Sequence, residues 1–110
     1  MNKVSRASIY DAPTLWVEID DLRIPCAVPT VAVTECIMNK AEQVVNFSSE
    51  MSQDQYDFAF ELLAIILSCN HNFVHFSPEE LKAKRITVTH IIGILTDWIQ
   101  FIGDLVNQKN

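Results

Sequence analysis

A short segment in the second half of the chain holds the residues best suited to metal chemistry. Cys69, His71 and His75 lie close together in the sequence, and thiolate and imidazole groups are ligands that zinc prefers. A structural zinc site normally has four ligands, and no fourth lies nearby in the sequence. In the alternative reading His71 favours the dipole at a helix end and Cys69 packs as a small apolar residue. We therefore expect no metal and no other cofactor, with a small zinc-binding protein using these three residues as an alternative.

The other thiols and carboxylates form no recognisable catalytic set. Cys36 follows Glu35 on a predicted helix, where adjacent residues face apart, and Cys26 precedes an apolar stretch. Neither thiol lies in the basic or glycine-rich setting that activates a nucleophilic cysteine. Asp97 and Asp104 stand seven residues apart, which is typical of a solvated helix stripe as well as of paired carboxylates. We expect a protein that is not an enzyme.

The charge distribution argues against nucleic acids and membranes as partners. Of the 110 residues, 49% are hydrophobic and 20% are charged, and the formal net charge is −6. Seven acidic residues and no Lys or Arg lie between Lys40 and Lys82, a stretch that would repel a phosphate backbone. The most apolar segment is interrupted by Asp97, Gln100 and Asp104, so it does not read as a membrane span.

Chain length and cysteine usage indicate one domain in a reducing compartment. A chain of 110 residues can bury one core without disulfides, and it contains three cysteines, an odd number. The first residues lead into no apolar signal-peptide core, so we expect reduced thiols and a cytoplasmic location. The polar residues 1–13 predict a flexible tail, and residues 14–110 predict a single globular domain.

Turn residues and helix caps predict a mainly α fold of the α+β class. The acidic pair Asp20-Asp21 separates two β-prone runs and predicts a β-hairpin over 14–26. Ser52 and Ser77 each stand three residues before a Gln or Glu, which is the spacing of a capping box. Apolar periodicity predicts three or four helices packed on the hairpin, over about 30–46, 53–69, 78–84 and 88–107.

The first of these helices has an apolar pattern that predicts one buried face. Apolar residues, some single and some in adjacent pairs, recur every three or four residues along it. Its members include Ile37, Met38, Ala41, Val44 and Val45.

Two other predicted helices carry more apolar surface than a one-sided core requires. Residues 58–67 are apolar almost all round, and Ile94 and Phe101 widen a stripe on the last helix that is already sufficient. We interpret the excess as surface for another chain, with Phe58, Ile94 and Phe101 as candidate partner-binding residues. The alternative is that these residues are buried within one protomer. Because apolar surface exposed to water is unfavourable in free energy, we also expect the chain to self-associate.

Four segments in a fixed order carry a resemblance to a known family. They are LWVEIDDLRIP at 15–25, LLAIIL at 62–67, FSPEEL at 76–81 and WIQ at 98–100. Over about residues 14–108 the chain resembles the small tail assembly chaperones of long-tailed bacteriophages. The resemblance implies a helical, self-associating, non-enzymatic protein of the host cytoplasm, which keeps the tape-measure protein soluble and helps to recruit tail-tube subunits. The alternative is a structural or regulatory homo-oligomer that satisfies its own apolar surface.

Overall fold

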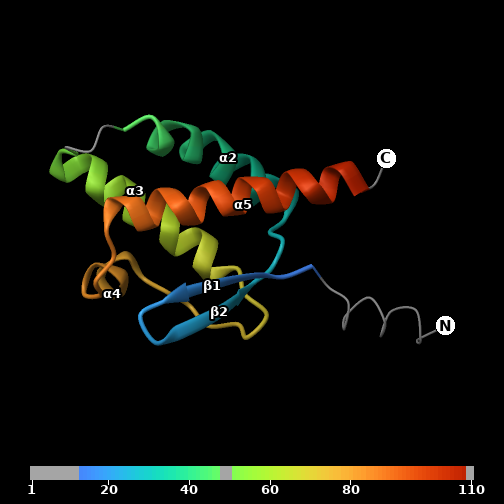
Figure 1. Ribbon diagram of the computed structural model, residues 1–110, viewed down its shortest axis with the longest axis horizontal. Helices are drawn as coiled ribbons and strands as arrows, with labels where there is room; N and C mark the ends of the chain where they lie inside the picture. Colours follow the sequence, from blue (N-terminus) through green and yellow to red (C-terminus); the bar gives the residue numbers. More distant parts are fainter. Residues whose placement is uncertain (1–12, 48–50, 109–110) are drawn as a thin grey trace.

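An antiparallel hairpin leads into four helices in the computed structural model, which describes residues 13–47 and 51–108 (Figure 1). The predicted mainly α fold with an N-terminal hairpin is confirmed. The predicted tail at 1–13 lies outside the described residues, apart from Pro13. The elements are β1 Leu15–Ile19, β2 Leu22–Cys26, α2 Val31–Val45, α3 Gln53–Ser68, α4 Pro78–Lys82 and α5 Val88–Gln108.

The hairpin has one face in the core and one face outside. Val17 pairs with Ile24 across the two strands, and both side chains are buried. On the outer face the Arg23 guanidinium lies 4.4 Å from the centroid of the Trp16 ring. Asp20 turns the chain with a φ of 53°, a left-handed conformation that Asp tolerates better than most residues. Burial alternates along the second half of β1, whereas in β2 Pro25 is buried together with Ile24 and Cys26.

Capping boxes begin α3 and α4. The Ser52 hydroxyl accepts from the Gln55 N–H at 3.3 Å, and the Gln55 side chain accepts from the Ser52 N–H at 3.0 Å. Ser77 and Glu80 make the same reciprocal pair at the start of α4. Because each box satisfies donors that a helix N-terminus leaves unpaired, it fixes where the helix starts.

The central helix is α3, which is covered over most of its apolar surface, whereas Glu61 stays exposed. It packs against α2, α4, α5 and β2, and Figure 1 shows it crossing α5 and ending beside the hairpin. The apolar surface that was predicted to be in excess on this helix is mostly used by four neighbouring elements within one protomer. Its buried residues are Ala59, Phe60, Leu62, Leu63, Ala64, Ile66 and Leu67.

The long helix α5 is buried on two sides rather than one. Trp98 and Leu95 face the main core, and Ile94 is also buried, with 6% of its surface exposed. Strand β1 packs against α5, and residues 15–18 border the same hollow as Ile94. The prediction that Ile94 is not needed in the core is therefore wrong. It assumed that α5 is buried on one side only, whereas the hairpin covers a second side.

Among the residues whose burial is described, Asn70 is the one buried polar side chain. Its amide nitrogen donates to the carbonyl oxygens of Leu67 at 2.8 Å and Val74 at 2.7 Å. Its amide oxygen accepts from the N–H groups of Asn72 and Val74, both at 3.0 Å. One side chain thus satisfies the end of α3 and the loop that follows it.

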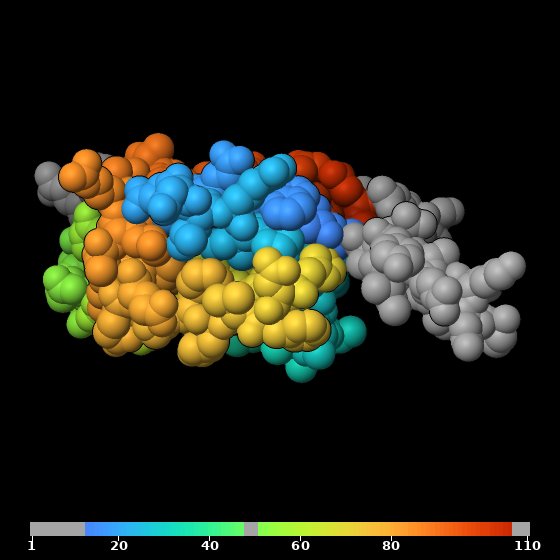
Figure 2. Space-filling view, turned by 90° about the horizontal axis from the view of Figure 1, so that it is seen from below, coloured from blue at the N-terminus to red at the C-terminus, as the bar shows by residue number. Residues whose placement is uncertain are grey.

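The same loop is tied to the hairpin through the backbone. Asn70 forms a β-bridge with Cys26, flanked by a hydrogen bond from the Ala27 N–H to the Cys69 carbonyl at 2.7 Å. A second bond runs from the His71 N–H to the Pro25 carbonyl at 2.9 Å. Figure 2 shows the hairpin and the segment after α3 side by side on one face. The end of α3 is therefore held against β2.

Replacing Asn70 should destabilise the fold strongly. Asn70→Ala leaves one buried and three partly buried backbone groups without this partner, and an unpaired buried group costs about 1–3 kcal/mol. We expect the free energy of unfolding to fall by about 3 kcal/mol in urea denaturation. Asn72→Ala is the matched control, because that side chain is exposed, and it should change stability by less than about 0.5 kcal/mol. Equal effects of the two changes would contradict a structural role for the Asn70 amide.

Candidate functional site

The three candidate metal ligands surround the end of α3 without forming a ligand set. Cys69 is half-buried at the helix terminus, and His71 and His75 are exposed. The His71 Nε2 atom lies 3.3 Å from the carbonyl oxygen of Pro13. Within residues 13–47 and 51–108, no group of three or more His, Cys, Asp or Glu side chains is placed to hold a metal ion. These three residues are close in the sequence, but their side chains do not converge on one metal position.

The thiols of the core are in environments that favour the protonated form. Burial raises the pKa of Cys26 to about 12, and the neighbouring Cys69 contributes to this rise. Burial also raises the pKa of Cys69. Cys36 is exposed, and all three cysteines are free. Because the thiolate is the reactive form, Cys26 and Cys69 are poor nucleophiles at neutral pH.

Helix α2 carries an exposed apolar stripe that the sequence pattern did not predict. Val31, Met38 and Val45 are 76%, 38% and 36% exposed. Successive members are seven residues apart, so they share one face of the helix. The sequence pattern assigned Met38 and Val45 to the buried face, whereas the structure buries their neighbours Ile37 and Val44. The seven-residue spacing was the available signal for this stripe.

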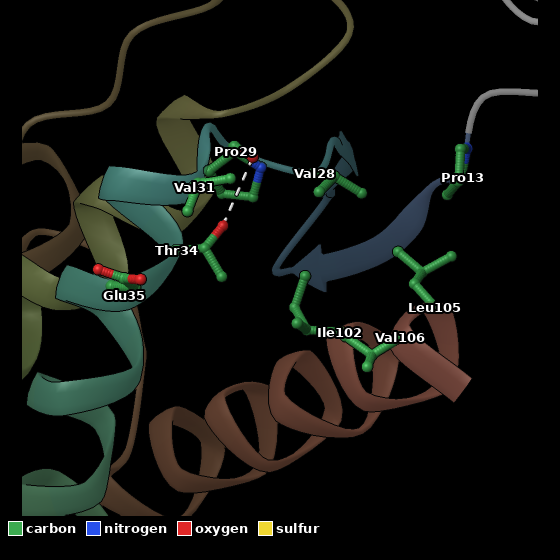
Figure 3. Close-up of a pocket in the computed structure, with 9 residues that line it drawn as sticks. All are labelled: Pro13, Val28, Pro29, Val31, Thr34, Glu35, Ile102, Leu105 and Val106. Carbon is green, nitrogen blue, oxygen red and sulfur yellow. Dashed lines mark hydrogen bonds between the residues drawn. The ribbon is translucent and has the colours of Figure 1, made fainter. Parts of the chain in front are cut away.

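An apolar hollow of about 550 Å³ lies where the start of α2 faces the end of α5. Figure 3 shows side chains from α2 on one side of this hollow and side chains from α5 across from them. Val106, which is 56% exposed, belongs to the α5 side. The lining consists of Pro13, Val28, Pro29, Val31, Thr34, Glu35, Ile102, Leu105 and Val106.

A second hollow of about 410 Å³ lies further along the same two helices. Val45 of α2 and Ile99 of α5 both line it, as does Gly103. A Cβ atom added at Gly103 would meet nothing within 4 Å, so the space there is open. Ile99 and Val106 are seven residues apart, as are the apolar residues of the α2 stripe. We call the two hollows together the α2–α5 groove, which is lined by Val31 and Val45 on α2 and by Ile99 and Val106 on α5. Met38 lies between Val31 and Val45 on the same face of α2.

The charged groups beside this groove are acidic. Glu35 lines the first hollow and Asp104 lines the second. Glu42 lies seven residues after Glu35, on the same face of α2. Residues 88–106 of α5 include no Lys or Arg. The one lysine of α2, Lys40, lies over an aromatic ring of α3 instead. The rim of the groove is thus negatively charged.

The three predicted partner-binding residues lie outside the two hollows. Ile94 is a core residue, as described above. Phe58 is half-buried and meets Phe47 edge-on, with ring centroids 6.2 Å apart. Phe101 is half-buried and packs against the core. Partner binding by Phe58 and Phe101 stays a prediction, whereas the most exposed apolar stripe belongs to α2.

Comparison with protein-family models, with curated proteins and with solved structures finds no match to this chain. Among the helices that the structure describes, none combines the length and the apolar character needed to cross a membrane. The candidate site is therefore defined by the geometry and chemistry of the α2–α5 groove.

The buried thiol makes the fold sensitive to alkaline pH. The folded pKa of Cys26 is raised from 9.0 to about 12, so its stabilising contribution is complete below pH 9 and is lost as the pH rises towards 12. This difference corresponds to at most about 4 kcal/mol. We expect the free energy of unfolding to fall more steeply over pH 9–11 in the native chain than in Cys26→Ala. Cys36→Ala, at an exposed cysteine, should keep the native slope. Identical slopes in all three proteins would contradict the assignment.

Proposed function

We propose that this protein is a non-enzymatic binding module that covers an apolar helix of a partner protein in the α2–α5 groove. The observation that carries the proposal is the exposed stripe of Val31, Met38 and Val45 beside Ile99 and Val106. Exposed apolar residues gathered on one side of a molecule are typical of protein interaction sites. The unit recognised would be a helix, because apolar residues at seven-residue spacing match the anchors of an amphipathic helix.

The shape of the groove suits a third helix beside α2 and α5. The two helices pack on each other, and both present apolar residues seven positions apart along their shared boundary. In helix bundles such residues pack between those of a neighbouring helix. The fifteen residues of α2 span about 22 Å, which is room for about four turns of a bound helix.

The lining of the groove supports binding rather than catalysis. The first hollow has two polar side chains, Thr34 and Glu35, among its nine lining residues. The Thr34 hydroxyl donates to the carbonyl oxygen of Pro29 at 3.4 Å and so serves the start of α2. Covalent catalysis would need a nucleophile paired with a base, and the Thr34 hydroxyl is bonded to this backbone carbonyl rather than to the Glu35 carboxylate.

The most specific form of the proposal is a tail assembly chaperone of a long-tailed bacteriophage. In that role the protein would keep the tape-measure protein soluble in the host cytoplasm and help to recruit tail-tube subunits. Support comes from the resemblance in the order of elements, together with a groove suited to a long amphipathic helix. In the alternative, a structural or regulatory homo-oligomer, a second copy of the chain would occupy the same groove.

A charge placed in the groove should abolish function without unfolding the protein. Val106→Asp sets a carboxylate on the groove wall, and burying it under a partner would be costly. We expect normal circular dichroism and melting, with at least a tenfold loss of soluble tape-measure protein when both proteins of one genome are co-expressed. Val74→Asp is the matched control, since Val74 is 47% exposed and lies outside the groove.

Phe101→Asp separates the core from the groove. Because Phe101 packs against the core, this change should lower the melting temperature, unlike Val106→Asp. The groove would have no role if Val106→Asp folded normally and kept the partner as soluble as the native chain does. A genome that encodes this chain and no tape-measure protein would contradict the chaperone form of the proposal.

A further inference from the structure

We infer that the α2–α5 groove takes a basic amphipathic helix, in which Lys or Arg residues flank an apolar stripe. This inference rests on the proposed function and adds the chemical class of the partner. The observation that supports it is the charge of the residues beside the apolar lining of the groove, rather than the apolar lining itself.

Acidic residues repeat along α2 in step with the apolar stripe. Glu35 lies four residues after Val31, and Glu42 lies four residues after Met38. Residues four apart are neighbours on a helix surface, so each carboxylate borders one apolar residue of the groove. Both glutamates are exposed. Asp104 adds a third carboxylate from α5, beside the second hollow.

The chain itself supplies no cation to this rim within residues 13–47 and 51–108. The ion pairs of these residues join Arg23 to Glu18 and Lys82 to Asp57, away from the groove. Lys40 lies on α2, but its ammonium nitrogen is 5.0 Å from the centroid of an α3 ring. In coiled coils, charged residues that flank the apolar seam select partners of opposite charge. The rim is therefore matched to a partner with cations at those flanking positions.

Charge also separates this partner from the two other occupants. A second copy would bring a net charge of −6 and its own carboxylates against the rim, an arrangement of like charges that opposes association. Residues 1–12 include Lys3 and Arg6 and join the groove at Pro13. These twelve residues also include Asp11, so the formal net charge of their side chains is +1, a weaker match to the rim than a helix with Lys or Arg at every flanking position.

Binding of three synthetic peptides to the full-length chain tests this inference. Each has about 21 residues with Leu and Ile on the seam, and the flanking positions are all Lys, all Gln or all Glu. Fluorescence anisotropy should show the Lys peptide binding at least tenfold more tightly than the Gln peptide, and the Glu peptide most weakly. The preference should shrink as salt is added, because exposed charges are screened.

Charge reversal on the rim should reverse the preference. In the double variant Glu35→Lys/Glu42→Lys we expect the Glu peptide to bind more tightly than the Lys peptide. The control Asp21→Lys/Glu79→Lys changes the net charge equally at exposed sites outside the groove, and it should keep the native order. If the control variant also bound the Glu peptide more tightly than the Lys peptide, to the same extent as the rim variant, the inference would be overturned. Net charge alone would then explain the selectivity.

The remaining outcomes distinguish this inference from the proposed function. Equal binding of all three peptides, lost in Val106→Asp, would keep the groove as a helix site and overturn the basic partner. Binding of no peptide would overturn both. A dimer in sedimentation that Val106→Asp abolishes would make a second copy the occupant. If Lys3→Glu/Arg6→Glu bound the Lys peptide tenfold more tightly than the native chain does, residues 1–12 would be the occupant. Occupation by a second copy or by residues 1–12 would each overturn the inference.

Discussion

A helix that is apolar on nearly every side must be covered on every side, and this requirement shapes the rest of the fold. In α3 the buried residues follow one another around the helix, so no single layer could protect them. The hairpin, α2, α4 and α5 each supply part of the cover. Asn70 holds the exit from α3 against β2 by satisfying four polar groups with one amide. In this arrangement α3 has less surface available to a partner than α2 or α5 has.

The groove follows from how α3 is covered. Both α2 and α5 direct one side to the core, and the sides that meet at their shared boundary stay open to solvent. Val31, Met38 and Val45 line this boundary from α2. Apolar surface left in water costs about 25 cal/mol per Å², so a partner helix that covered the groove would recover that free energy. The acidic rim adds selectivity for its charge, since electrostatic complementarity distinguishes partners more than it adds affinity.

Features set by neighbouring residues could be predicted from the sequence, whereas features set by packing could not. The hairpin and the capping boxes at Ser52 and Ser77 depend on short-range spacing. By contrast, adjacent pairs such as Ile37 and Met38 are both apolar, and only the position of α3 decides which one is buried. Ile94 was assigned to a surface because the packing of α5 against the distant β1 leaves no local signal in the sequence. For the same reason Cys69, His71 and His75 gave a metal candidate that the structure does not assemble.

Methyl NMR of the chain during titration with a basic amphipathic helix would test most directly whether a partner binds in a preformed groove between α2 and α5. Met, Val and Ile methyl groups report separately on the groove, the core and the opposite face. A preformed groove predicts the largest shift changes at Met38, Val45 and Val106, with small changes at Val74 and at the core residue Ile66. Changes centred on Val74 would place the partner on the face formed by the hairpin and the loop after α3. Changes throughout the core would mean that binding opens the fold, and either result would contradict a preformed groove between α2 and α5.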